Sequence, residues 1–190
     1  MAIVLASQSP RRQELLARIG VEDFKTLSLD IDESYPAGLS PEDTVRYIAK
    51  KKCDAAAALC APDDLIITAD TMVFLGNDRL GKPRDEEDAF RMLRALAGNR
   101  HTVCTGVSLR RGAQYESFAV STGVTFRRAS DDEIRAYIKT GEPMDKAGAY
   151  GVQSRGALFV ERIDGDFFNV MGLPVEQLGL VLARFGVKLL

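Results

Sequence analysis

The sequence predicts an α/β fold built on a mixed sheet with flanking helices. Apolar stretches of strand length alternate with amphipathic stretches of helix length, but the alternation is irregular. The stretches 101–109 and 115–127 are separated by a short turn around 111–112, which is typical of an antiparallel hairpin. The continuous apolar run 65–69 instead has the composition of a strand buried on both faces, as in parallel sheets.

The chain begins with a short apolar strand that ends near Leu5. A helix over 10–19 follows, with Ser9 as its expected cap, a proline in its first turn and Gly20 as its stop. A loop that contains Glu33 then leads to Ser40, which is the expected cap of the next helix.

This second helix is expected to continue toward the alanine run 55–58. The apolar strand 65–69 comes next, with Asp70 at its end, and 72–75 is a second extended piece before a turn at 76–78. The later predicted elements are a helix over 85–97, the hairpin strands, a helix begun by the capping box 130–133, a loop over 141–156, strands over 157–163 and 167–170, and a helix over 174–185.

The composition narrows the class of protein. A length of 190 residues suits a single domain, so we expect one domain over 1–190. The net charge is −2 and no basic block occurs, which argues against nucleic acid as a partner. No apolar run approaches the ~20 residues of a membrane span, and no export signal is visible. With three widely spaced cysteines that match no metal or redox motif, a cytoplasmic location is expected.

The set of reactive side chains argues against two common kinds of catalytic site. His101 is the single histidine, so a zinc site is not expected, and a Ser-His-Asp arrangement would have to use a histidine at a predicted strand start. A metal would therefore sit on carboxylates, which suits Mg²⁺ or Mn²⁺.

Arg11 and Arg12 follow directly after the expected helix start, where a helix favours acidic residues. Backbone N–H groups, the helix dipole and two guanidinium groups would together bind a phosphate. The alternative is that both arginines point into water.

Asp70 is the strongest single candidate for chemistry, because a carboxylate at the exit of a buried strand is costly unless it is paired or binds a cation. The alternative is an aspartate that caps a turn. Thr71 and Lys82 follow closely, and Lys52 belongs to a basic run of which at most one or two members can face one site. Glu33 is a candidate metal ligand beside Asp70.

The loop 143–153 combines a charged pair, small residues, an aromatic ring and an amide. Gln153 offers both a donor and an acceptor to a base edge, and Tyr150 is free to stack on a ring or to pack in the core. Several cations and carboxylates without histidine suit metal-assisted phosphoryl chemistry. The chain lacks the complete phosphate-loop motif Gly-x-x-x-x-Gly-Lys-Ser/Thr, because Pro83 follows Lys82, so a P-loop enzyme is excluded.

Taken in order, the motifs resemble the Maf family of nucleoside triphosphate pyrophosphatases over nearly the whole chain. The matching segments are Leu5–Leu16, Ala69–Thr71, Gly81–Asp85, His101–Val107, Gly141–Gln153, Ile163–Asp166 and Val170–Pro174. The resemblance implies a fold similar to inosine triphosphate pyrophosphatases, with an elongated sheet and two lobes around a cleft. It implies hydrolysis of a nucleoside triphosphate to the monophosphate and pyrophosphate with a divalent cation, and a homodimer is the family expectation.

The resemblance also implies a role for each matching residue. Asp70 is the expected proton acceptor and, with Glu33, a metal ligand. Phosphate contacts are expected from Ser7, Arg12, Lys52 and Lys82, and substrate choice from Arg11, Thr71 and Gln153.

The form Ala69-Asp70-Thr71 looks like the subgroup that acts on dTTP and UTP, and modified pyrimidine nucleotides belong to the same expectation. Alternatives are a 7-methyl-GTP pyrophosphatase, whose subgroup typically has Ser-Asp-Gln there, and a nucleotide-binding regulator of cell division with little turnover. Two departures from the family pattern bear on substrate choice. Ser154 replaces a usual glycine, and Phe167-Phe168 replaces a commoner tyrosine pair.

Overall fold

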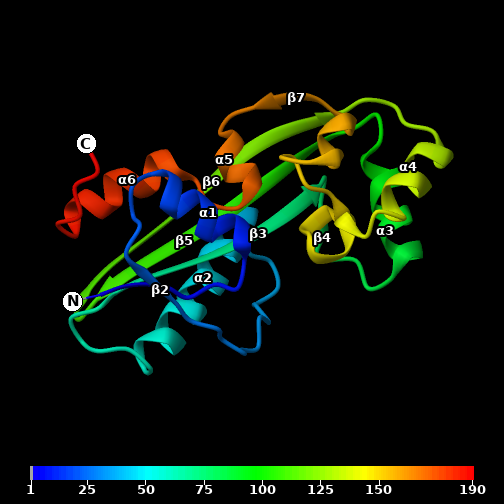
Figure 1. Ribbon diagram of the computed structural model, residues 1–190. Helices are drawn as coiled ribbons and strands as arrows, with labels where there is room; N and C mark the ends of the chain where they lie inside the picture. The colour runs from blue at the N-terminus through cyan, green and yellow to red at the C-terminus, as the bar shows by residue number, and fades with distance from the viewer. Residues whose placement is uncertain (1) are drawn as a thin grey trace. The chain divides into compact units, whose positions relative to one another are not determined.

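The computed structural model describes residues 2–190, and Figure 1 labels its helices and strands. The chain divides into two compact units. The first comprises Met1–Asp70, Thr105–Val120 and Gly172–Leu190, and the second comprises Thr71–Cys104 and Ser121–Met171. The expectation of one domain over 1–190 stays a prediction.

The strands are β1 (Ile3–Leu5), β2 (Phe24–Thr26), β3 (Leu65–Leu75), β4 (Asp78–Leu80), β5 (Arg100–Arg111), β6 (Gln114–Phe126) and β7 (Val160–Asp164). The helices are α1 (Pro10–Arg18), α2 (Pro41–Ala57), α3 (Glu86–Leu96), α4 (Asp131–Ile138), α5 (Phe167–Met171) and α6 (Val175–Arg184). Short 3-10 helices are η1 (Glu142–Asp145), η2 (Ala147–Ala149) and η3 (Arg155–Phe159).

The sheet is mixed, as predicted. Its strand order is β2-β1-β3-β5-β6-β7, with β4 paired to β3 outside this path. The β1–β2 and β1–β3 pairs are parallel, whereas β3–β4 and β6–β7 are antiparallel. The α/β class and the mixed sheet expected from the irregular alternation are therefore confirmed.

In the first unit, helix α2 packs directly on strands β3 and β5. The hydroxyl of Thr68 on β3 donates to the carbonyl of Ala49 on α2 at 2.7 Å. A Cβ atom at Gly106 on β5 would lie 2.4 Å from the backbone carbon of Val45 on α2. Only glycine permits this close approach, which brings the buried, mainly apolar face of α2 against the sheet.

The second unit has an aromatic core. The ring of Phe126 lies 5.0 Å from His101 and 4.7 Å from Tyr150, centroid to centroid, both edge to face. Tyr150 therefore packs inside, which decides between the two alternatives left open for it. Its hydroxyl forms a 2.8 Å hydrogen bond with Nε2 of His101.

Two of the predicted helix caps form as expected. The side chain of Ser40 accepts from the N–H of Asp43, and Ser130 forms a full capping box with Glu133. Asp85, expected as the first residue of a helix, is instead the cap of α3 and accepts from the N–H of Asp88. Ser9 occupies the cap position of α1, but its side chain makes no capping hydrogen bond.

Two predictions of local structure are wrong. Strand β3 runs unbroken over Leu65–Leu75, so the expected break after residue 69 does not occur. The stretch 167–170 forms helix α5 rather than a strand. The carboxylate of Asp166 accepts from the N–H of Phe168 at 2.7 Å, and Asn169 donates to the carbonyl of Val103 at 3.1 Å. These side-chain bonds override the β propensity of the two phenylalanines.

Strands β2 and β4 are three residues long each and are not predicted from the sequence. Residues 157–159 belong to η3, so the predicted strand 157–163 is confirmed only over β7. Within residues 2–190, no helix combines the length and the apolar character needed to cross a membrane.

Candidate functional site

Asp70 lies inside strand β3 and not at its end, which corrects the expected position. Its parallel neighbour β1 ends first, because the pairing of these strands runs only to Leu5 opposite Ile67. Asp70 therefore lies just beyond the carboxyl end of β1, the edge at which α/β proteins commonly place their sites. The residue is 6% exposed, and a carboxylate with so little water needs a partner.

Lys52 on α2 provides that partner. Its Nζ donates to Oδ1 of Asp70 at 2.8 Å and pairs with Oε1 of Glu33 at 2.9 Å. The side chain of Lys52 is 15% exposed, so water screens the pair with Asp70 only weakly. Three segments that are distant in sequence thus meet at one ammonium group.

The other lysines of the basic run face elsewhere, as the helical spacing predicts. Lys50 pairs with Asp54 on the same helix. Lys51 donates to the carbonyl of Ser34 at 3.0 Å and lies 3.6 Å from Oδ2 of Asp32. Lys51 and Lys52 therefore both hold the loop that carries Glu33.

The second carboxylate oxygen of Asp70 has no such partner. Oδ2 is buried and accepts no hydrogen bond from the described residues 2–190. A buried carboxylate oxygen without a donor is costly, and its presence in a native site calls for a ligand, a proton or a cation. This oxygen is the clearest structural sign of a functional site in the first unit.

Arg12 lies close by, held at the start of α1. Its guanidinium donates to the carbonyl of Gly172 at 2.8 Å, to the carbonyl of Ala69 at 2.9 Å and to Oγ of Ser7 at 3.3 Å. Burial lowers the pKa of Arg12, and the negative charge of Asp70 opposes this shift. One of the two arginines therefore turns into the protein, which excludes the alternative in which both point into water.

The first unit thus brings together Ser7, Arg12, Glu33, Lys52 and Asp70. Arg11 is half-buried at the same helix start, and Thr71 directly follows Asp70. No group of three or more His, Cys, Asp or Glu side chains among residues 2–190 is placed to hold a metal ion. Asp70 and Glu33 still fit a hard cation, because Mg²⁺ commonly takes one or two protein carboxylates and completes its shell with substrate phosphates and water.

Lys82 and Gln153 belong to the second unit, and both are exposed. The N–H of Gly148 donates to the carbonyl of Gly81 at 3.1 Å, so the turn η2 lies against the segment that carries Lys82. Glu142 carries no sequence signal of a site residue, yet its carboxylate organises the neighbouring loop.

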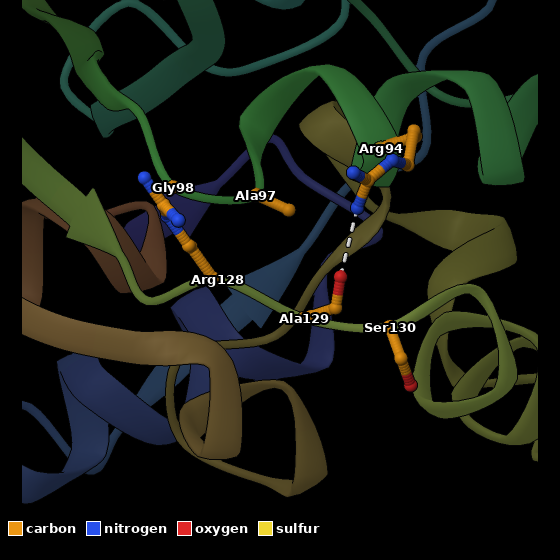
Figure 2. Close-up of a pocket in the computed structure, with 6 residues that line it drawn as sticks. All are labelled: Arg94, Ala97, Gly98, Arg128, Ala129 and Ser130. Carbon is orange, nitrogen blue, oxygen red and sulfur yellow. Dashed lines mark hydrogen bonds between the residues drawn. The ribbon is translucent and has the colours of Figure 1, made fainter.

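A polar pocket of about 500 Å³ also lies on the second unit, and Figure 2 shows its lining. It is lined by Arg94, Ala97, Gly98, Arg128, Ala129 and Ser130. None of these is a predicted site residue. The guanidinium of Arg94 donates to the carbonyl of Ala129 at 2.8 Å, so one of the two arginines at this pocket already makes a hydrogen bond to the backbone (Figure 2).

Comparisons with known proteins identify the family and the fold. The family model described as Maf-like protein matches residues 2–185. A Bacillus velezensis protein named dTTP/UTP pyrophosphatase is 46% identical over 98% of this chain and 97% of its own length. A Phocaeicola vulgatus protein of the same name is 49% identical over 93% of this chain and 92% of its own length.

Among solved structures, the Staphylococcus aureus Ham1 protein superposes with a TM-score of 0.55 at 15% identity, covering 97% of this chain and all 100% of its own. A HAM1 protein from Coxiella burnetii gives 0.53 at 13% identity, covering 97% of this chain and 99% of its own. These likenesses show the fold alone, and they confirm the fold class expected from the resemblance.

Proposed function

We propose that this chain, which belongs to the Maf-like protein family, hydrolyses pyrimidine nucleoside triphosphates to the monophosphate and pyrophosphate. The substrates are dTTP, UTP and modified relatives, since relatives of 46% and 49% identity are named dTTP/UTP pyrophosphatase. The observation on which the proposal rests is the buried, unpartnered Oδ2 of Asp70 beside the Lys52–Glu33 pair.

In this proposal Asp70 is the catalytic base. Lys52 holds Oδ1, which leaves Oδ2 to accept a proton from the attacking water. The water oxygen bonds to the α phosphorus as the bond from that phosphorus to the α–β bridging oxygen breaks. Pyrophosphate leaves with the electron pair, and the proton of the water passes to Asp70.

Positive groups bind the triphosphate. We assign phosphate contacts to Arg12, Lys52 and the hydroxyl of Ser7 in the first unit, and to Lys82 in the second. A cation about 4 Å from a phosphate oxygen stabilises it by about 4 kcal/mol at an effective dielectric constant near 20. Several such contacts offset the loss of water around a triphosphate.

A divalent cation, Mg²⁺ or Mn²⁺, is part of the proposal. Asp70 and Glu33 would hold it, and when bound it supplies positive charge that neutralises the triphosphate. Choice of the base is assigned to Arg11, Thr71 and Gln153 on the family resemblance. The same resemblance carries the expectation of a homodimer in the cytoplasm.

The test is a nucleotide panel assayed for pyrophosphate with Mg²⁺ and with Mn²⁺. It contains dTTP, UTP, modified pyrimidine nucleotides, the purine triphosphates and 7-methyl-GTP. The proposal predicts the highest kcat/KM on pyrimidine nucleotides and no release without a divalent ion. Preference for 7-methyl-GTP would replace the substrate assignment. Tight triphosphate binding in calorimetry with no pyrophosphate from any nucleotide would indicate a nucleotide-binding regulator instead.

A further inference from the structure

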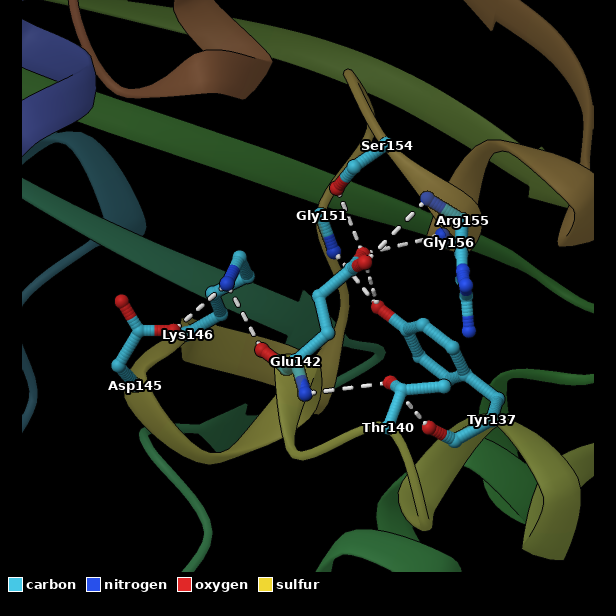
Figure 3. Close-up of polar contacts among 9 residues, drawn as sticks. All are labelled: Tyr137, Thr140, Glu142, Asp145, Lys146, Gly151, Ser154, Arg155 and Gly156. Carbon is cyan, nitrogen blue, oxygen red and sulfur yellow. Dashed lines mark hydrogen bonds and ion pairs between the residues drawn. The ribbon is translucent and has the colours of Figure 1, made fainter.

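The carboxylate of Glu142 in the second unit is surrounded by hydrogen-bond donors (Figure 3). Oε1 accepts from the hydroxyl of Tyr137 at 2.8 Å, from Oγ of Ser154 at 2.6 Å and from the N–H of Gly156 at 3.2 Å. Oε2 accepts from the N–H of Arg155 at 3.3 Å. Burial alone would raise the pKa of Glu142, but these donors outweigh it and hold the pKa below its usual value.

The donors come from two places that Glu142 joins. Tyr137 lies on helix α4, and its hydroxyl also accepts from the N–H of Gly151 at 3.1 Å. The remaining donors, Ser154, Arg155 and Gly156, lie on the segment 151–156. Glu142 and Tyr137 therefore bind both ends of this segment to the end of α4.

Two glycines close the base of the segment. A Cβ atom at Gly156 would lie 2.6 Å from the carbonyl oxygen of Gly151 and 2.8 Å from the hydroxyl of Tyr137. A Cβ atom at Gly151 would lie 2.9 Å from Oγ of Ser154. The two ends of the segment are thus in direct contact, and the short loop between them begins and ends at the same place.

Gln153 stands on this loop. The preceding Val152 is buried, 5% exposed, and anchors the loop in the core, whereas Gln153 is exposed. The backbone that carries the Gln153 amide is therefore fixed on one side by apolar packing and on the other by the Glu142 carboxylate. An amide reads a base edge only when its donor and acceptor are held in one direction.

We propose that Glu142 is a positioning residue for base selection, which holds the 151–156 segment so that the Gln153 amide is presented to a pyrimidine base. This inference rests on the proposed function, because it takes the ligand to be a pyrimidine nucleoside triphosphate. Ser154 belongs to the same hydrogen-bond network, because its hydroxyl donates to the Glu142 carboxylate and the usual glycine has no such donor. The departure at position 154 therefore strengthens the loop.

The experiment measures binding, so that it does not depend on turnover. Calorimetry with the α,β-imido analogues of dTTP and GTP, which resist cleavage at the α phosphate, gives a discrimination ratio for each variant. Variants are Glu142→Gln, Glu142→Ala and Ser154→Ala, and the matched control is Glu161→Ala, an exposed glutamate on β7 of the same unit. Hydrogen exchange of residues 151–156 is measured on the same samples.

In Glu142→Ala we expect the dTTP analogue to bind about tenfold more weakly, with the GTP analogue changed by less than about twofold, because a tenfold change corresponds to about 1.4 kcal/mol. Exchange of 151–156 should accelerate while α1 and β3 stay protected. Glu142→Gln, which keeps three of the four acceptor bonds, should restore most of the discrimination, and Ser154→Ala should lower it by about threefold. Glu161→Ala should behave as the wild type.

The proposal is overturned if the discrimination ratio of Glu142→Ala equals that of the wild type, whether or not the segment exchanges faster. Equal loss of affinity for both analogues would also overturn it, because a collapsed unit gives that result. If the wild type releases no pyrophosphate but Glu142→Ala still lowers the discrimination ratio, the proposed turnover is contradicted and the role of Glu142 is supported.

Discussion

Asp70 in the first unit and Glu142 in the second are carboxylates with opposite surroundings. Oδ1 of Asp70 accepts from one ammonium group, and its Oδ2 accepts nothing from the described residues 2–190. Both oxygens of Glu142 accept hydrogen bonds, with donors from two side chains and two backbone N–H groups. A saturated carboxylate holds backbone in place, whereas a half-satisfied buried one keeps an oxygen for a ligand or a proton.

The largest expected effect comes from replacing the carboxylate of Asp70 by an amide, and the matching change at Glu142 is the comparison. Asp70→Asn keeps the shape of the side chain but removes the proton acceptor, and we expect kcat for pyrophosphate release to fall by about 10³-fold, within the range of lost general-base catalysis. Glu142→Gln should leave kcat within about twofold, because it touches no reacting atom. Pyrophosphate assays with thermal unfolding of both variants measure this contrast.

Unchanged turnover in Asp70→Asn would end the proposed role of that carboxylate. An equal loss of kcat in both variants, at unchanged melting temperature, would remove the distinction between the two sites.

A smaller effect is expected from the lysine that bridges the first site. Lys52→Gln removes the charge between Asp70 and Glu33, and we expect kcat/KM to fall by about 10²-fold, the loss seen when one electrostatic donor is removed. The control is Lys50→Gln on the same helix, whose lysine pairs with Asp54 and should leave kcat/KM unchanged. Equal losses in the two variants would mean that the general charge of α2, and not the position of Lys52, matters.

His101, buried in the aromatic core of the second unit, is kept neutral, and this predicts a pH dependence of stability. Burial lowers the pKa of His101 to about 4 from 6.5. The unfolded chain therefore binds more protons than the folded chain between these values, so the free energy of unfolding falls as the pH falls through this window. Protonation of this residue should lower the free energy of unfolding by about 2 kcal/mol between about pH 7 and pH 5.

The measurement is chemical denaturation across this pH range for the wild type and for His101→Gln, which keeps a donor for the Tyr150 hydroxyl. The variant should lose that part of the pH dependence, whereas carboxylates that titrate lower affect both chains alike. Identical pH slopes would mean that the pKa of His101 is the same in the folded and unfolded chain, which would contradict the lowered value.

The sequence predicts most of the fold for reasons that are local. Caps such as Ser40 and Ser130 mark helix starts because their side chains bond backbone three residues away. The helix at 167–171 is not predictable locally, because Asn169 bonds to Val103 and Thr122, which are distant in sequence. Short strands such as β2 have too few residues for a periodic signal.

The candidate site was predictable in its residue types and less so in its geometry. The apolar run before Asp70 marks a buried carboxylate, but only the end of β1 explains why that carboxylate lies at an edge. Helical spacing limits the lysines that can face one site, and the structure selects Lys52. Glu142 gave no signal, because a glutamate in a polar loop normally faces water, and its donors become visible only when the loop is folded.

The most direct test of the central claim follows the oxygen of the attacking water. Hydrolysis of dTTP is run in ¹⁸O-labelled water with Mg²⁺, and the products are resolved by mass spectrometry. Water activated at Asp70 and attacking the α phosphorus places the label in dTMP and leaves pyrophosphate unlabelled. Label in pyrophosphate, or products of dTDP and orthophosphate, would contradict the account.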